Sequence, residues 1–175
     1  VRQRDVAAHA GVALGTLYKS FRSKEDILCA ALERETEALE RRMEVNPATG
    51  NTAVERLNSF FKIVTRGFCK KPKYARAVLR AMASGEPEVA RNVAAYQGRM
   101  TGLIIAAVRN VGRLTYADAT EKPPSKDESN LALFLQQFWF ASLVGWSAGL
   151  ITQTEVVDQT TTAAELLMRA LDTET

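Results

Sequence analysis

The first 28 residues carry two short helical patterns on either side of Gly11, and this layout constrains the fold more than any other part of the chain. The apolar residues of the first pattern are Val6, Ala7 and Ala10. In the second pattern Leu17 and Phe21 are four residues apart, as neighbours on one helix face are. Small Ala7 lets a second helix cross closely above the first. We therefore predict a helix-turn-helix, a unit that places its second helix in the major groove of DNA.

Small, polar and basic residues remain on the outer face of the second helix. Gly15 has no side chain and lets a phosphate or base edge approach the backbone, while Tyr18 and Lys19 supply a hydroxyl and a charge. Residues 1–24 contain five lysines and arginines and one acidic residue, a net charge of +4. The expected DNA contacts are Arg2, Arg4, Ala13, Leu14, Gly15, Thr16, Tyr18, Lys19 and Lys24.

The same residues resemble the signature of the TetR family of transcriptional regulators. The matching runs are Arg4-Asp5-Val6-Ala7, Ala10-Gly11-Val12, Gly15-Thr16-Leu17-Tyr18, Phe21 and Ser23-Lys24-Glu25. The alternative is an ordinary corner between two helices of a helical protein, and any one of these features alone would favour it. The resemblance implies an N-terminal DNA-binding domain followed by a helical domain that dimerises and senses a small ligand. Its specific motif covers about residues 1–45.

Three positions depart from the family pattern. Ala13 replaces a serine that caps the second helix, Ser20 replaces an aromatic residue, and Arg2 replaces a threonine that caps the first helix. The chain also begins inside the motif. Family members have an earlier helix that packs across it, so we expect that residues preceding Val1 are missing.

The rest of the chain has the periodicity of helices and no convincing strand alternation, which predicts an all-α fold. Asn46–Asn51 is rich in turn residues and separates two domains, 1–45 and 52–175. The first contains the helix-turn-helix and a connecting helix capped by Ser23 with Asp26. Residues 112–124 are polar, end in two prolines and are expected to form a loop. The other expected helices are 52–69, 73–83, 88–111, 126–151 and 155–171.

Residues 131–154 contain no charged side chain, and this stretch is long enough to cross a bilayer. Gln136 and Gln137 in its first half, and the absence of a flanking lysine or arginine cluster, count against a membrane span. A helix buried on both sides explains the composition equally well. We therefore expect no membrane association and a homodimer formed by helices 126–151 and 155–171.

Catalytic and metal-binding patterns are missing from the sequence. His9 is the sole histidine, which excludes a multi-histidine metal site, and no glycine-rich phosphate loop occurs. Cys29 and Cys69 are far apart and are expected to be free thiols of a cytoplasmic protein. We expect no enzyme activity, no metal and no cofactor.

Aromatic and sulfur-containing residues of the second domain provide material for an apolar pocket. The expected ligand-binding residues are Phe61, Phe68, Met82, Tyr96, Met100, Phe134, Phe138 and Trp139. Asn58, Arg80, Gln97 and Gln137 are candidates for polar contacts. The N-terminal sequence is most similar to actinobacterial regulators of sterol and fatty-acid metabolism, which implies a steroid, acyl or CoA-linked ligand.

The sequence thus predicts a homodimeric repressor that binds a palindromic operator in double-stranded DNA. Its two recognition helices would lie about 34–36 Å apart, and a small hydrophobic ligand would release it by favouring a conformer with another spacing. Two other hypotheses stay open: a helical lipid-binding or carrier protein that binds no DNA, and a membrane-anchored helical protein.

Overall fold

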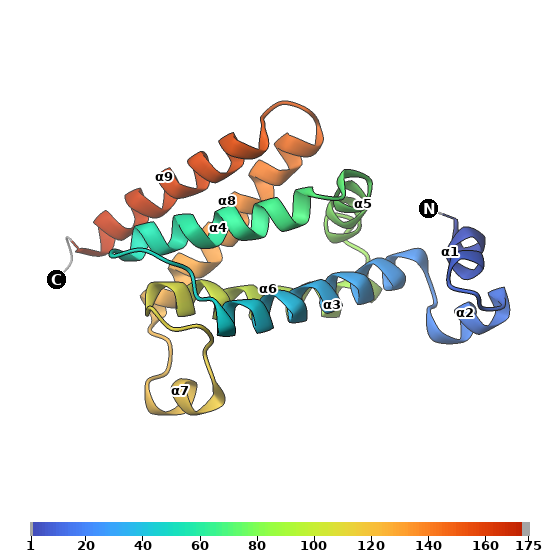
Figure 1. The fold of residues 1–175 in the computed structure, drawn as a ribbon, viewed down its shortest axis with the longest axis horizontal. Coiled ribbons are helices and arrows are strands. Elements are labelled where there is room, and N and C mark those ends of the chain that lie inside the picture. Colours follow the sequence, from blue (N-terminus) through green and yellow to red (C-terminus); the bar gives the residue numbers. More distant parts are fainter. Residues whose placement is uncertain (1, 173–175) are drawn as a thin grey trace.

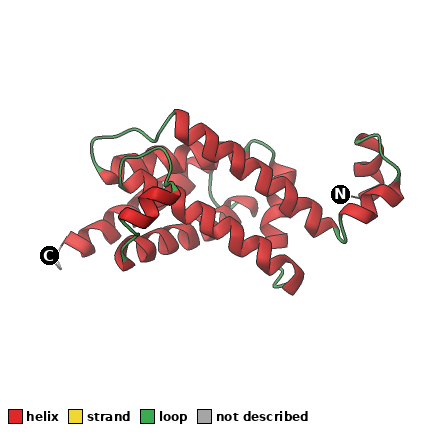
Figure 2. Cartoon of the chain, turned by 90° about the horizontal axis from the view of Figure 1, so that it is seen from below, coloured by secondary structure: helices red, strands yellow, loops and turns green. Residues whose placement is uncertain are grey.

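The computed structural model describes residues 2–172, which form nine helices and no strand (Figures 1 and 2). The helices are α1 (Gln3–His9), α2 (Leu14–Ser20), α3 (Lys24–Val45), α4 (Ala53–Cys69), α5 (Pro72–Met82), α6 (Pro87–Val108), α7 (Tyr116–Glu121), α8 (Lys126–Ser147) and α9 (Gln153–Asp172). The short pair α1 and α2 projects from one end of a larger helical bundle. The predicted all-α class is confirmed.

The pair α1–α2 is joined by a tight turn in which Gly11 has φ +66°, a conformation that glycine adopts without steric cost. The Val12 amide donates to the Ala7 carbonyl oxygen at 3.0 Å and closes the turn. Ala7 and Leu17 are buried where the two helices cross. The predicted helix-turn-helix geometry is therefore present.

Ser23 caps α3 as predicted, because its hydroxyl accepts a hydrogen bond of 3.0 Å from the Asp26 amide. The reciprocal bond differs from a standard capping box. The Asp26 carboxylate accepts from the backbone amide of Arg22 at 3.0 Å, one residue earlier than the cap. This bond fixes the chain between α2 and α3.

Helix α3 leaves the N-terminal pair and packs along α6 and α5 of the bundle (Figure 1). Its C-terminal end is held tightly. A Cβ atom on Gly112 would lie 2.9 Å from the carbonyl oxygen of Met43, so only glycine fits there without displacement. The connecting helix expected in the first domain therefore rests on the second.

The buried Arg56 fixes the linker that follows α3. Its Nε and Nη2 donate at 2.8 Å to the carbonyl oxygens of Ala107 and Val108, at the C-terminal end of α6. Its Nη1 donates to the carbonyl oxygens of Gly50 and Asn51 at 3.3 and 3.2 Å. One side chain thus satisfies four carbonyl groups and joins the 46–52 linker to α6.

Helix α8 passes through the bundle and packs against α9, α6 and α5, while α9 covers α4 (Figure 1). The N–H of the Trp139 indole donates to Thr65 Oγ1 at 2.9 Å and joins α8 to α4 in the core. None of the helices in residues 2–172 combines the length and apolarity needed to span a bilayer.

The sequence misses one element. Residues 112–124 were expected to be loop, yet α7 forms within them, and Thr115 and Asp118 make its capping box. The spacing of Thr115 and Asp118 is that of a capping box and could have predicted a helix start. The two prolines that follow instead favoured a loop. The capping boxes of Thr52 with Glu55 and of Ser125 with Glu128 are present.

Candidate functional site

Most of the expected DNA-binding residues are exposed, and the exposed ones of α2 lie away from the side of the helix on which Leu17 is buried. Tyr18 is 51% exposed, whereas Leu17 beside it is 6% exposed and faces α1. Leu14 is partly buried. The exposed members of the expected set are Arg2, Arg4, Ala13, Gly15, Thr16, Tyr18, Lys19 and Lys24.

The start of α2 is open to an external partner. Ala13 has no side chain able to cap the helix, as its identity predicts, so the first amides of α2 face outward without a side-chain acceptor. A Cβ atom added to Gly15 would meet no other atom within 4 Å. The fold itself therefore does not require a glycine at this position.

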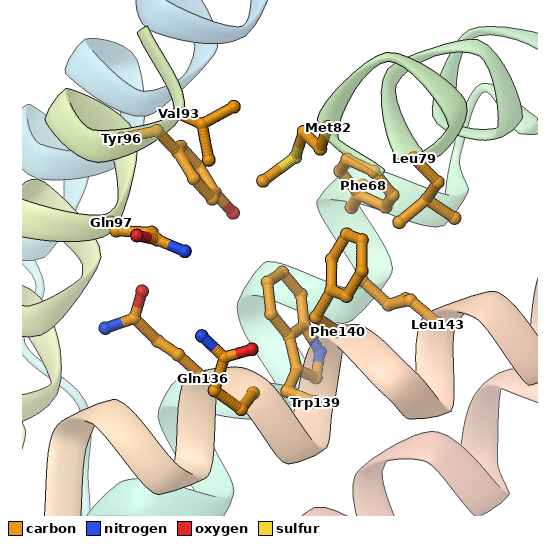
Figure 3. A pocket seen from close by; sticks show the side chains of 11 residues that line it. Phe68, Leu79, Met82, Val93, Tyr96, Gln97, Gln136, Trp139, Phe140 and Leu143 are labelled. Atoms are coloured by element: carbon orange, nitrogen blue, oxygen red, sulfur yellow. The ribbon is translucent and has the colours of Figure 1, made fainter. Parts of the chain in front are cut away.

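A cavity of about 160 Å³ lies inside the bundle where α4, α5, α6 and α8 converge (Figure 3). None of the described side chains that line it is charged. Its lining residues are Phe68, Leu79, Met82, Val93, Tyr96, Gln97, Gln136, Gln137, Trp139, Phe140 and Leu143.

Polar groups gather at one end of this cavity and apolar groups at the other. The hydroxyl of Tyr96 and the amides of Gln97 and Gln136 point toward the empty space, opposite Leu79 and Leu143 (Figure 3). Burial raises the pKa of Tyr96, so its phenol stays neutral and can donate a hydrogen bond. The amide of Gln136 also hydrogen-bonds Thr101 Oγ1 at 2.8 Å, which fixes it between α6 and α8.

Four of the eight expected ligand-binding residues line this cavity, namely Phe68, Met82, Tyr96 and Trp139. Phe61 is fully buried in the core, and Met100 lines a neighbouring hollow between α3 and α4. Phe134 and Phe138 are 51% and 42% exposed on the opposite face of α8. The expectation that these two face the cavity has to be corrected, because Gln136 and Trp139 turn the other side of α8 inward.

Only two of the four candidate polar contacts line the cavity. Gln97 and Gln137 line the cavity, whereas Arg80 lies in a surface hollow between α1, α3 and α5. Asn58 is elsewhere, and its Oδ1 is buried without a hydrogen-bond partner among residues 2–172. The sequence did not identify five lining residues, namely Leu79, Val93, Gln136, Phe140 and Leu143. Four of them are apolar or aromatic residues of the kind found in any helical core. Gln136 could have been identified, because it is a polar residue in an otherwise apolar helix.

Two family models match the chain. Residues 1–31 match the model described as bacterial regulatory proteins, tetR family. Residues 50–167 match the model described as tetracyclin repressor-like, C-terminal domain.

Among curated proteins the chain is similar to HTH-type transcriptional repressors KstR. It is 29% identical to the KstR of Rhodococcus jostii, over 96% of this chain and 73% of that protein. It is 26% identical to the KstR of Mycobacterium tuberculosis, over 96% of this chain and 71% of that protein.

Two solved structures have the same fold. A TetR transcriptional regulator from Rhodococcus sp. superposes with a TM-score of 0.76 and 18% identity over 95% of this chain and 84% of that one. Thermus thermophilus FadR, a TetR-family repressor in complex with lauroyl-CoA, superposes with a TM-score of 0.68 and is 17% identical. The match covers 96% of this chain and 83% of the FadR chain.

Proposed function

Because this chain belongs to the TetR family of bacterial regulatory proteins, we propose that it is a homodimeric repressor of transcription, released from a palindromic operator by a small hydrophobic ligand. The family consists of regulators and not of enzymes. The observation that carries the proposal is the outer face of α2, which is exposed, basic and uncapped at its start.

Gly15 supports DNA as the partner of this face. A glycine in a helix destabilises it relative to alanine, by up to about 1 kcal/mol in the interior and by less in the first turn, where Gly15 lies. Nothing in the protein approaches the Cβ position of Gly15, so packing does not explain the residue. A DNA backbone or base edge lying against the start of α2 does explain it, and Lys19 and Lys24 would then contact the duplex from either side.

The exposed side of α8 supports the dimer. Leu133, Phe134, Phe138 and Val144 are 42–51% exposed on the outer side of α8, and Leu166 of α9 is 59% exposed. Single apolar residues on a surface are common, but two phenylalanines and two aliphatic residues exposed on one side of a helix are typical of an interface. A second copy of the chain related by a two-fold axis would cover this side and set the spacing of the two α2 helices.

The cavity supports a hydrophobic ligand with a neutral polar end. Its walls hold aromatic and aliphatic side chains, and hydrogen bonding is confined to Tyr96 and three glutamine amides. We propose a steroid, acyl or CoA-linked ligand whose apolar part enters this space. The lauroyl-CoA bound by FadR, which has the same fold, is an acyl compound linked to CoA and supports this proposal.

The test uses a duplex that the protein itself selects from random sequence. We expect binding to a two-fold symmetric site and release when progesterone or lauroyl-CoA is added. Phe140→Arg places a charge in the cavity and should remove the response to ligand while leaving DNA affinity near that of the wild type. Lys62→Glu on the exposed side of α4 is the control, and it should keep both properties.

A different result identifies the alternative. A helical lipid-binding or carrier protein would bind the apolar ligand and show no salt-dependent affinity for duplex DNA. DNA binding without any effect of either compound would instead leave a repressor that is not regulated through this cavity.

A further inference from the structure

Tyr96 lies where three hollows between the helices of the bundle meet. The first is the cavity described above. The second, which we call the α3 hollow, has about 260 Å³ and lies between α3 and α6. The third, the α4 hollow, has about 270 Å³ and lies between α3 and α4. Among the residues that the structure describes, Tyr96 alone lines all three.

The ring of Tyr96 thus separates the cavity from the two hollows, and unfilled space lies on both of its sides. Protein interiors are close-packed, and a large side chain is normally held in one rotamer by its neighbours. The hydroxyl of Tyr96 makes no hydrogen bond to any residue in 2–172 and points into the cavity (Figure 3). The ring itself is packed against the hydrophobic core, but no hydrogen bond holds its hydroxyl, and unfilled space lies on both of its sides.

On the far side of the ring are buried residues of the helix that leads to the DNA-binding pair. Leu32 and Thr36 of α3 line both the α3 hollow and the α4 hollow, and both are less than 7% exposed. The α3 hollow also reaches Ser20 and Phe21 at the end of α2. A ring that turns out of the cavity therefore moves toward α3 and toward the connection between α2 and α3.

Helix α3 can respond at this end and not at the other. Gly112 and Arg56 hold the C-terminal end and the linker, as described above. Near Tyr96, the contact between α3 and α6 includes one arginine, Arg99, that faces three glutamates of α3 at 3.3–3.6 Å. Partly exposed pairs of this kind contribute little individually, and Arg99 can exchange one carboxylate for another when α3 shifts.

We propose that Tyr96 is the residue through which filling of the cavity is communicated to α3 and hence to the DNA-binding helices. A group that occupies the cavity takes the space into which the hydroxyl points. The ring turns into the hollows beside it and presses on Leu32 and Thr36, and the start of α3 is displaced. The inference rests on the proposed function and adds the residue that couples its two sites.

The experiment fills the cavity without a ligand. Gln97→Trp places an indole in the cavity from α6, and Leu79→Trp does so from α5, so the test survives if one variant fails to fold. Each is measured alone and combined with Tyr96→Ala, by affinity for the selected duplex, after circular dichroism and sedimentation have established fold and dimer. We expect each tryptophan to weaken DNA binding at least about fivefold alone, at the lower end of typical allosteric couplings, and less than about twofold together with Tyr96→Ala.

Two further variants separate communication from simple relief of crowding. Tyr96→Phe keeps the ring and should preserve the effect of Gln97→Trp. Phe68→Ala enlarges the cavity without opening the α3 hollow and should preserve more of the effect than Tyr96→Ala does.

The outcomes distinguish this inference from the proposed function. If the wild type binds no duplex DNA, both are wrong. If it binds DNA but the tryptophans have no effect, or the same effect with and without Tyr96→Ala, the coupling role is wrong and the repressor stands. Equal loss of the effect in Phe68→Ala and Tyr96→Ala also overturns the coupling role.

Discussion

Arg109 and Glu128 form a two-pronged ion pair in which Nε donates to Oε1 and Nη2 to Oε2, both at 2.7 Å. Arg109 ends α6 and Glu128 lies in the first turn of α8, so the pair joins the two helices that flank the cavity. Arg109 also donates to the carbonyl oxygens of Lys122 and Pro123, which fixes the segment containing α7.

This pair makes stability depend on pH in the acidic range. The hydrogen bonds from Arg109, and then the Ser125 amide, lower the pKa of Glu128 from 4.5 to about 2 in the folded protein. The stabilisation is therefore complete above pH 4.5 and is lost as the pH falls toward 2. Glu128→Gln should cost about 1–3 kcal/mol of unfolding free energy at neutral pH and show a weaker loss on acidification. Urea unfolding at several pH values measures both, and parallel pH curves for variant and wild type would contradict the prediction.

Gly15→Ala should separate stability from DNA binding. The alanine adds at most about 0.5–1 kcal/mol of stability, because it favours the helix and meets no neighbour, although Gly15 lies in the first turn. It should weaken binding to the selected duplex about tenfold, or about 1.4 kcal/mol, since its methyl group lies where the duplex approaches. Gly98→Ala is the matched control, because Gly98 is also helical, exposed and without neighbours at Cβ. It should give the gain in stability without the loss of affinity.

Operator binding should fall steeply with salt. If each subunit neutralises three to five phosphates, the logarithm of the association constant should change with the logarithm of salt concentration with a slope of about −5 to −9. Lys24→Ala should weaken binding to all sequences and flatten the slope, because its ammonium group is well exposed and pairs with Glu25 at 3.5 Å. Lys19→Ala should instead relax preference at one base position. A slope near zero would rule out phosphate contacts as the source of affinity.

Phe138→Glu should convert the dimer into a monomer and reduce operator binding together with it. The side chain lies on the exposed apolar side of α8, where a charge would face the second copy without a partner. Sedimentation at micromolar concentration measures the association. Asp127→Lys, at the exposed start of the same helix, should leave the dimer intact. A Phe138→Glu protein that remains dimeric would place the interface elsewhere.

Thr65→Val should destabilise the core through Trp139. Valine has nearly the shape of threonine but cannot accept the indole hydrogen bond of 2.9 Å, which leaves a buried N–H without a partner. We expect a cost of about 1–3 kcal/mol and a shift of tryptophan emission. Thr65→Ser keeps the acceptor and should shift emission much less.

The sequence predicts the N-terminal part of this protein well because its constraints are local. Ala7, Gly11 and Leu17 each have one role, set by a crossing, a turn and a helix face, and the structure places them accordingly. Ser125 with Glu128 likewise marks the start of α8 within one residue.

The cavity was less predictable because α8 is apolar on all sides. Its periodicity does not distinguish the face toward Trp139 from the face toward Phe138, and that choice depends on where α4, α6 and α9 lie. Phe61 and Phe68 show the same difficulty on α4. Both are aromatic and face the bundle, but only Phe68 reaches the empty space, since Phe61 packs edge-on against Phe60 at a centroid distance of 5.2 Å.

The tight contact of Gly112 with the C-terminal end of α3 makes that end a fixed point, so that a small movement in the middle of the helix becomes a larger one at its start. At 1.5 Å per residue, Lys24 lies about 30 Å from the contact at Glu44, and Leu32 and Thr36 lie about 18 and 12 Å from it. If α3 rotates as a rigid rod about its fixed end, 1 Å of movement opposite Tyr96 becomes about 2 Å at the first residue of the helix, and a symmetric dimer doubles the change in spacing between its recognition helices. A displacement of about 1 Å opposite Tyr96 is in this way enlarged to about 4 Å between the two recognition helices, slightly more than the ~3.4 Å rise of one base pair.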